Sequence, residues 1–558
     1  MTALLPFLLN SLLPRVADPG NPRFFLPAVL EALPGSNSAG KLLPLEEDAW
    51  DLGPIGGNVG ETITQSFAAN WSTYLERMEG EDLGGQQAIA PPGNPAPSLS
   101  LGGAPRSIRI GGLRNLRILG APDYEAVADG YAIALTMEFD HWDGTGGRPD
   151  LPRLGLSAPF TMRQALCLAD TGGTVCNGRR STDIAGHGTV SARLTGAYLD
   201  LLVHVTAPRD AGGAFGTGLV VSVERVTMRG ADAATLPGIE VDDLTIEADF
   251  HAFLLNFWRS QITAALTSPD GVSGILGNIN AALARPGNRA ALAGEVTKNL
   301  AAVLDDLFAP VSGGLAPSSA RASVNEADRY LFDRLRHALG RPASRLFLPR
   351  LLAQGGSPGL EPLHIARVPL PDIRPDPRLT FTDCHLTGLT VTGLSNARGA
   401  ETAFDLDGDA MRFEAEVGGW SPAPVLPGGP AIPAPPARGA ADFSITPKGE
   451  RSAITGSIAM TAQAVQLSGR AVATGTSDGD LVITLTGLRL SARDLSRAIR
   501  VTVRLDSWFA EMINAGANSP GVLDGILGAL NDALKDQLAA LSRDITRHAR
   551  EAIASELR

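Results

Sequence analysis

A short motif occurs twice in this chain, 251 positions apart. It consists of a Ser-Pro step, then Gly-Ile-Leu-Gly, an Asn and an Ala-Leu step, and it begins at Ser268 and again at Ser519. All of these identities fall in one register without a gap, and the upstream aromatic pair Phe257-Trp258 falls opposite Trp508-Phe509. A match of this kind indicates an internal duplication, so we interpret the chain as two copies of one structural unit.

Weaker similarities upstream occur in the same order in both halves. An alternating apolar stretch that ends in Gly-Leu-x-Asn occurs at Ile108–Asn115 and at Leu389–Asn396, and Leu219–Val223 resembles Leu481–Leu485. The order predicts a Pro- and Gly-rich N-terminal extension at 1–57, a first module at 58–315 and a second module at 320–558.

Each module is predicted to begin with a helix, at 60–78 and at 323–339, and to continue with antiparallel strands. Period-two alternation marks the strands, and Gly, Asp, Asn and Pro separate them. In order, the predicted strands are 107–118, 131–139, 191–205, 219–228 and 244–250, then 379–393, 410–417, 453–467, 481–490 and 499–505.

Helices are predicted to close each module, at 253–266 and 508–513 and then after the Ser-Pro step. In the second copy the last helix is expected to run from Gly521 almost to the end of the chain, whereas Arg285-Pro286-Gly287-Asn288 should break it in the first copy. Glycines inside a helix are unfavourable, so the recurrence of Gly525 and Gly528 suggests close packing against a sheet or a ligand. We favour packing against a sheet.

Composition excludes several classes of partner. The chain carries 47 basic and 59 acidic residues, a net charge of −12, and no Lys/Arg stripe that could neutralise phosphates, so we expect no nucleic acid partner. The same balance allows at most transient contact with anionic membranes. No apolar run is long enough to span a bilayer.

The N-terminus, Met1–Asn10, is apolar but has no basic residue before it, so a short amphipathic helix is expected rather than a signal peptide. The compartment is left open between the cytoplasm and export by a non-standard route. Cys167 and Cys176 bracket a turn-rich loop and either form a disulfide or remain two thiols, while Cys384 is expected to be a small buried apolar residue.

The order of these elements resembles the TULIP lipid-binding superfamily, which includes the bactericidal permeability-increasing, takeout and juvenile-hormone-binding proteins. The strand Leu386–Asn396 and the segment Gly274–Phe308 are most similar to the takeout pattern. The resemblance implies an α+β fold in which each of two tandem modules wraps a highly curved antiparallel sheet around a long helix. It further implies an apolar channel between sheet and helix that holds an acyl chain, a sterol or a terpenoid.

Carried over to this sequence, the resemblance places the channel wall on the apolar faces of the closing helices. The expected ligand-binding residues are Ile275, Leu276, Ile279, Leu283, Ile513, Ile526, Leu527, Leu530 and Leu534. For any single one of these side chains, simple core packing is the favoured alternative. Tandem copies also occur in toxin-associated bacterial proteins of the superfamily, where a scaffold role within a larger protein assembly is equally conceivable.

Catalytic and metal-binding patterns are weak. Asp140-His141-Trp142-Asp143 places an imidazole between two carboxylates, as a general base requires, but it lies at a strand end before a Gly-rich turn, so a surface turn is favoured. Asp405, Asp407, Asp409 and Glu416 mimic a calcium loop, yet Ala410 stands where such a loop needs glycine, which favours a charged hairpin turn. We therefore assign no catalytic residue, metal or cofactor.

The sequence thus predicts a non-enzymatic carrier whose partner is a lipid or another hydrophobic small molecule. The main alternative is a structural or interaction protein with closed cores, and a hydrolase on an unrecognised scaffold is a distant third.

Overall fold

The structure of this protein is a computed structural model. Apart from the single positions 22, 217, 233, 234 and 377, it describes residues 4–54, 86–89, 98–142, 150–170, 181–247, 252–308, 310–311, 315, 325–341, 344, 346–349, 362–399, 403–407, 410–418, 436–475, 480–505 and 510–556. Three predictions lie outside this part of the chain: the helix at 60–78, the pairing of Cys167 with Cys176, and the conformation of the aspartate at position 409.

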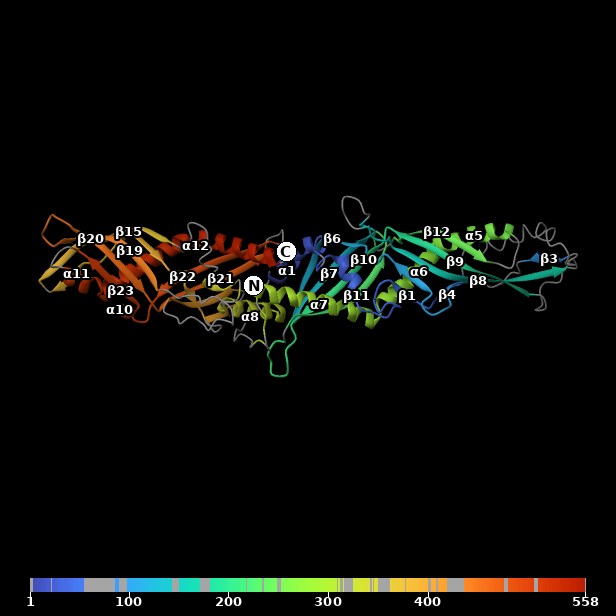
Figure 1. Cartoon of the computed structure of the whole chain (residues 1–558), viewed down its shortest axis with the longest axis horizontal. Helices are drawn as coiled ribbons and strands as arrows, with labels where there is room; N and C mark the ends of the chain where they lie inside the picture. The colour runs from blue at the N-terminus through green and yellow to red at the C-terminus, as the bar shows by residue number, and fades with distance from the viewer. Residues whose placement is uncertain are drawn as a thin grey trace.

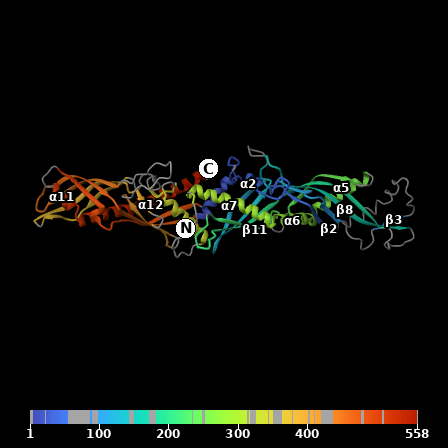
Figure 2. The same ribbon diagram turned by 60° about the horizontal axis from the view of Figure 1, so that its bottom comes forward.

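The molecule is elongated, and the two halves of the sequence build its opposite ends (Figure 1). Both ends of the chain lie near the middle, where the halves meet, and a view turned by 60° shows the same elongation (Figure 2). All described strand pairs are antiparallel and helices accompany them, so the α+β class with antiparallel sheets is confirmed.

The first half contains two sheets. Sheet 1 has eight strands: β1 (Leu45–Glu47), β2 (Ala49–Pro54), β3 (Gln86–Ile89), β4 (Ser98–Gly102), β5 (Ile108–Gly111), β8 (Gly155–Asp170), β9 (Ser181–Thr195) and β12 (Gly238–Glu247). Sheet 2 has four strands in the order β11-β10-β7-β6: β11 (Val220–Arg229), β10 (Tyr198–Thr206), β7 (Gly130–Phe139) and β6 (Leu116–Val127).

The second half also contains two sheets. Sheet 3 has six strands: β13 (Leu363–Pro369), β14 (Ile373–Asp376), β15 (Leu379–Thr392), β19 (Ala437–Pro447), β20 (Ile454–Ala462) and β23 (Ile499–Arg504). Sheet 4 has five: β16 (Ala397–Arg398), β17 (Phe404–Asp407), β18 (Ala410–Val417), β21 (Val465–Gly475) and β22 (Leu481–Ser491).

Pairing order recurs between the halves. The path β8-β9-β12 in sheet 1 has a counterpart in β19-β20-β23 of sheet 3, and β11-β10-β7 in sheet 2 has one in β22-β21-β18 of sheet 4. The alternating apolar residues of these strands face inward, as in the burial of every second residue along β23 and along β10.

Nine helices are described. They are α1 (Leu4–Val16), α2 (Leu26–Ala32), α5 (Ala252–Thr267), α6 (Pro269–Leu283), α7 (Pro286–Phe308), α8 (Glu326–Gly340), α10 (Leu495–Ala498), α11 (Ala510–Ala517) and α12 (Pro520–Glu556). The Ser hydroxyl at position 268 caps α6 by accepting from the Gly271 amide at 3.1 Å. The predicted break between α6 and α7 and the unbroken α12 are both confirmed, as is the N-terminal helix.

Three predicted strands were wrong, because each is two strands that belong to different sheets. The stretches 107–118, 191–205 and 453–467 turn from one sheet to the other at Gly112, Gly196 and Ala464, whose φ angles are 77°, 63° and 56°. At these three positions the positive φ interrupts the pleat and the chain leaves one sheet for the other, but the apolar alternation resumes directly after each turn. The period alone therefore could not reveal these corners.

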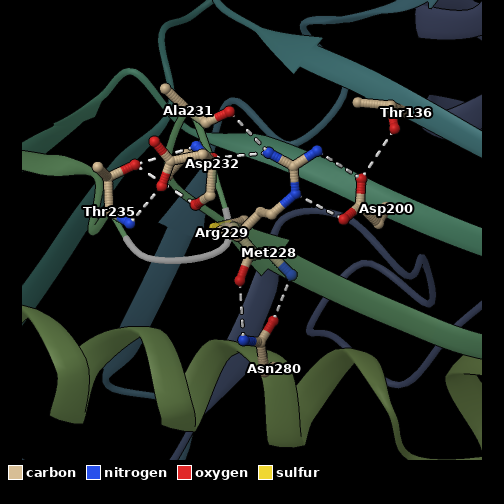
Figure 3. A network of polar contacts seen from close by, with 9 residues as sticks. Thr136, Asp200, Met228, Arg229, Ala231, Asp232, Thr235 and Asn280 are labelled. Atoms are coloured by element: carbon tan, nitrogen blue, oxygen red, sulfur yellow. Dashed lines mark hydrogen bonds and ion pairs between the residues drawn. The ribbon is translucent and has the colours of Figure 1, made fainter.

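The shared Asn of the repeated motif anchors its helix to a strand in both halves. The amide of Asn280 on α6 accepts from Met228 N at 2.6 Å and donates to Met228 O at 3.0 Å (Figure 3). Asn531 on α12 bonds Leu490 N and Leu490 O at the same two distances. Both strands, β11 and β22, are the edges of their sheets. The helices thus occupy main-chain groups that an edge strand leaves unpaired.

A second pair of contacts repeats at the other end of the same strands. The hydroxyl of Thr297 on α7 accepts from Val221 N at 2.9 Å, and that of Thr546 on α12 accepts from Ile483 N at 2.9 Å. Met228 and Leu490 are 262 residues apart in the sequence, and so are Val221 and Ile483. The similarity of Leu219–Val223 to Leu481–Leu485 predicts the same spacing.

The close packing predicted from the motif glycines holds for only one glycine of each pair. A Cβ at Gly525 would lie 3.3 Å from Pro371, and one at Gly274 would lie 3.5 Å from Leu52. At Gly277 and Gly528, in contrast, a Cβ would meet nothing within 4 Å. The packing explanation is therefore wrong for these two exposed glycines.

Helix α8 lies where the two hydrophobic cores meet. Its Tyr330 and Leu331 belong to the core of the first half, whereas Phe332 and Leu339 belong to that of the second. Buried polar contacts hold the helix in place: Arg334, 1% exposed, donates to Leu304 O at 3.0 Å and to Asp305 at 2.8 Å. The two halves are therefore joined by a packed element.

Candidate functional site

The nine residues predicted to line a channel lie in the two cores. Ile275, Leu276 and Ile279 on α6 are buried, and Leu283 is partly buried against the same core. Ile513, Ile526, Leu527, Leu530 and Leu534 are buried in the second core. Leu527 and Leu530 border a cavity between sheets 3 and 4, but its volume is about 20 Å³. A space of that size holds one water molecule at most.

Two larger cavities lie further along the molecule, and none of the nine predicted residues, all of which the structure describes, borders either of them. We name them the lid cavity, of about 240 Å³, and the junction cavity, of about 130 Å³.

The lid cavity lies between the inner face of sheet 2 and three helices. Strands β6, β7, β10 and β11 form its floor, α7 forms one wall, and the N-terminal helices α1 and α2 cover it. Its apolar lining includes Leu9, Leu12, Leu13 and Val16 of α1, Leu26, Val29 and Leu30 of α2, Ile133, Leu135, Leu201 and Val203 of the sheet, and Leu292, Val296, Leu300 and Val303 of α7.

Three polar contacts hold the N-terminal helices over this cavity. Tyr124 on β6 donates to Asn10 on α1 at 2.8 Å. Arg23, between the two helices, pairs with Asp306 on α7 at 2.7 Å, and Glu31 on α2 pairs with Arg114 at 2.6 Å. The two N-terminal helices therefore form a lid over this cavity.

The junction cavity lies between sheet 4 and α12, close to the first half of the molecule. Helix α8 and the last residues of α7 close it. All of its lining residues are apolar, and they include Leu335 and Leu339 of α8, Leu307 and Phe308 of α7, Phe413, Leu467, Ala473 and Ile483 of sheet 4, and Leu541, Ile545 and Ile553 of α12. Helix α7 thus borders both cavities.

The sequence did not predict either cavity, because the residues that line the cavities have the same pattern as residues of a packed core. The strand residues alternate as in any half-buried sheet, and α1 lies in an extension without a repeat to compare it with. A usable signal was present in α12, where the apolar face that includes Leu538 and Leu541 continues past the repeated motif.

A polar cluster in the same region joins neighbouring strands of sheet 2. On the outer face of sheet 2, Arg229 pairs with Asp200 at 2.6 Å, and Thr136 donates to the same carboxylate at 2.9 Å (Figure 3). Burial alone would raise the pKa of Asp200, but the bonds from Arg229 and Thr136 outweigh it and hold that pKa below its ordinary value.

Asp140, one of the two carboxylates beside His141, has a structural role. Its side chain accepts from Leu154 N at 2.7 Å, and its φ of 59° places it in a turn. Burial raises the pKa of this carboxyl.

The residues that mimic a calcium loop lie on two paired strands. Asp405 and Asp407 belong to β17, and the register of β17 with β18 places Asp407 opposite Ala410, as in a hairpin. Within the described residues, no three His, Cys, Asp or Glu side chains gather closely enough to hold a metal ion.

Cys384 is buried, as predicted, and its thiol lies 3.4 Å from Phe381 O.

In the part of the chain that the structure describes, no helix combines the length and apolarity needed to cross a bilayer.

Comparison with known proteins gives a weak picture. No family model matches this chain, and no curated protein matches it. Among solved structures, a crystal structure of lipopolysaccharide binding protein is similar at 10% identity over 87% of this chain and 91% of that chain, with a TM-score of 0.19. Takeout 1 of Epiphyas postvittana is similar at 13% identity over 43% of this chain and 89% of that chain, with a TM-score of 0.15. TM-scores this low do not show a shared fold.

Proposed function

We propose that this protein is a non-enzymatic carrier of a hydrophobic ligand, such as a lipid, an acyl chain or a sterol-like molecule. In this proposal the chain consists of two tandem modules, each with an antiparallel sheet curved around its closing helix. The ligand lies in the lid cavity, the junction cavity or both.

The observation that carries the proposal is the combination of size and lining in these two cavities. A cavity of about 150 Å³ lined by aliphatic and aromatic side chains stays dry and can take up benzene. The junction cavity, at about 130 Å³, is close to that size, and the lid cavity, at about 240 Å³, exceeds it. Protein interiors are otherwise close-packed, so two voids of this kind in equivalent places favour a role in binding.

The energetics suit a ligand with little polar recognition. Removing apolar surface from water gains about 25 cal/mol per Å², so a ligand that buries about 200 Å² gains about 5 kcal/mol. Lining atoms that face a void lack packing partners, and a bound chain would supply them.

The paired contacts of Asn280 with Met228 and of Asn531 with Leu490 support the tandem arrangement. In both halves, the helix that starts at the repeated motif is fixed to the edge of the sheet whose inner face borders a cavity. In the second half this same helix, α12, borders the junction cavity, whereas in the first half the following helix, α7, borders the lid cavity and is fixed to the same strand through Thr297. Helices attached in this way keep a gap open between helix and sheet, because the gap cannot close by sliding.

Native mass spectrometry of the purified protein, followed by organic extraction, tests the proposal. We expect an apolar molecule that leaves on denaturation, or uptake of an added fluorescent fatty acid by ligand-free protein. A protein that contains no such molecule and takes up no probe would instead be a scaffold with closed cores.

A further inference from the structure

The two cavities differ in the chemistry of their walls. The junction cavity is bordered by apolar side chains alone, whereas the lining of the lid cavity also includes Arg23 and Asn299. An arginine beside a mostly apolar cavity is unusual, because its charge is stable only near water or an anion. Arg23 meets this condition because 40% of its side chain is exposed, and we take its position in the lining as the mouth of the cavity.

The surroundings of Arg23 leave it able to bind an anion. Its Nη1 lies 2.7 Å from a carboxylate oxygen of Asp306, and its guanidinium carbon lies 5.1 Å from the centre of the Phe24 ring. A guanidinium has five N–H donors, so a single contact through Nη1 leaves further donors for a second acceptor. Asn299, two helical turns before Asp306 on the same side of α7, adds an amide at the cavity wall.

Building on the proposed function, we propose that the lid cavity binds a single-chain amphiphile with a carboxylate head group, such as a fatty acid. Its chain occupies the apolar space under α1 and α2, and its carboxylate binds Arg23 at the mouth. The junction cavity, which lacks such a group in its lining, takes wholly apolar ligands.

The charge balance at the mouth favours a carboxylate over a phosphate. Arg23 is the one cationic side chain in the lining, and Asp306 stands beside it. One guanidinium that already faces Asp306 can compensate at most one further negative charge, so the second charge of a phosphate head group would remain uncompensated beside an apolar cavity.

The alternative is that the Arg23–Asp306 pair only clamps the lid. The two roles predict opposite results for Asp306. If the pair is only a clamp, Arg23→Gln and Asp306→Asn both loosen the lid and change binding in the same direction. If Arg23 binds the ligand, Asp306 competes for it, so Arg23→Gln weakens binding and Asp306→Asn strengthens it.

The test is calorimetric titration of the ligand-free, full-length protein with decanoic acid and with methyl decanoate at neutral pH, where the acid is ionised. For decanoate we expect a loss of affinity of about three- to tenfold in Arg23→Gln and a gain in Asp306→Asn. Methyl decanoate should bind all variants alike. Arg114→Gln is the matched control, because Arg114 also holds the lid, through Glu31, but is absent from the cavity lining.

Three results would overturn the inference. Equal affinity of the native protein for acid and ester, shifts of the same sign in Arg23→Gln and Asp306→Asn, or a decanoate-specific loss in Arg114→Gln would each show that Arg23 does not recognise a carboxylate. In all three cases the carrier function stands. Failure of the native protein to bind either compound would instead overturn the carrier proposal itself.

Discussion

Tyr131 and Asp328 form a hydrogen bond of 2.6 Å that fastens sheet 2 to helix α8 between the two cores. The Asp328 side chain is buried, at 1% exposure, and among the described residues its second oxygen has no hydrogen-bond partner. Burial raises the pKa of Asp328 from 3.8 to about 6, although the bond from Tyr131 lowers it. The same burial raises the pKa of Tyr131.

This carboxyl should make the stability of the protein depend on pH. The folded state holds the proton more tightly than the unfolded state, so its contribution is fully present below about pH 4 and is lost as the pH rises through about 6. A shift of this size corresponds to about 2 to 3 kcal/mol. Urea unfolding at several pH values should show this decline in the native protein and a flatter profile in Asp328→Asn. Equal slopes in both proteins would refute the assignment.

Removal of either motif asparagine should destabilise the protein. Asn531→Ala leaves both main-chain groups of Leu490 without their partner, and Asn280→Ala does the same to Met228, at a cost of about 1 to 3 kcal/mol each. Thermal or urea unfolding measures the loss. Asn278→Ala is the control, because Asn278 donates only to Gly274 O within its own helix and should be neutral or slightly stabilising. A similar loss in all three variants would argue against a special role of the strand contact.

Alanine at the exposed motif glycines should stabilise the protein. In Gly277→Ala and Gly528→Ala the new methyl group meets nothing within 4 Å, so the gain in helix propensity of about 0.5 to 1 kcal/mol is retained. Gly525→Ala should gain less, since its methyl group would lie 3.3 Å from Pro371. Calorimetric melting of the three variants tests this order, and a larger gain at Gly525 would contradict it.

Filling one cavity should abolish binding there and leave the other cavity functional. Leu135→Trp places an indole ring in the lid cavity, and Ala473→Leu adds three carbons to the junction cavity. Because the side chains enter existing space, we expect a change in stability of about 1 kcal/mol or less. The controls Ala134→Trp and Thr474→Leu place the same groups on exposed neighbours of the same strands. Titration with an apolar fluorescent probe distinguishes the variants, and unimpaired uptake by both filled proteins would place binding elsewhere.

The repeat predicted the arrangement of helices better than it predicted the cavities. Identity at Asn280 and Asn531 indicated equivalent helices, and both side chains make equivalent contacts. Whether the helix face around Ile526 packs solidly or leaves a gap depends on the summed volumes of side chains from several strands. A local sequence pattern does not contain this total volume. The residues predicted to bind a ligand are therefore well packed, whereas the larger cavities lie toward the middle of the molecule.

The corners between sheets were hidden for a related reason. Ala464 adopts a positive φ that its residue type does not suggest, and alternation continues on both sides of it. The role of α1 was equally invisible, since an apolar helix at a chain end indicates only that it packs somewhere. Tertiary contacts such as Tyr124 with Asn10 decide where.

The anchors at Met228 and Leu490 are directed at peptide groups, which every residue except proline provides in full. Evolution can therefore exchange the strand residue freely, as the Met and the Leu at these two places illustrate, without loosening the joint. A few fixed amides of this kind leave the remainder of each half free to change in composition while the joint between helix and strand is kept.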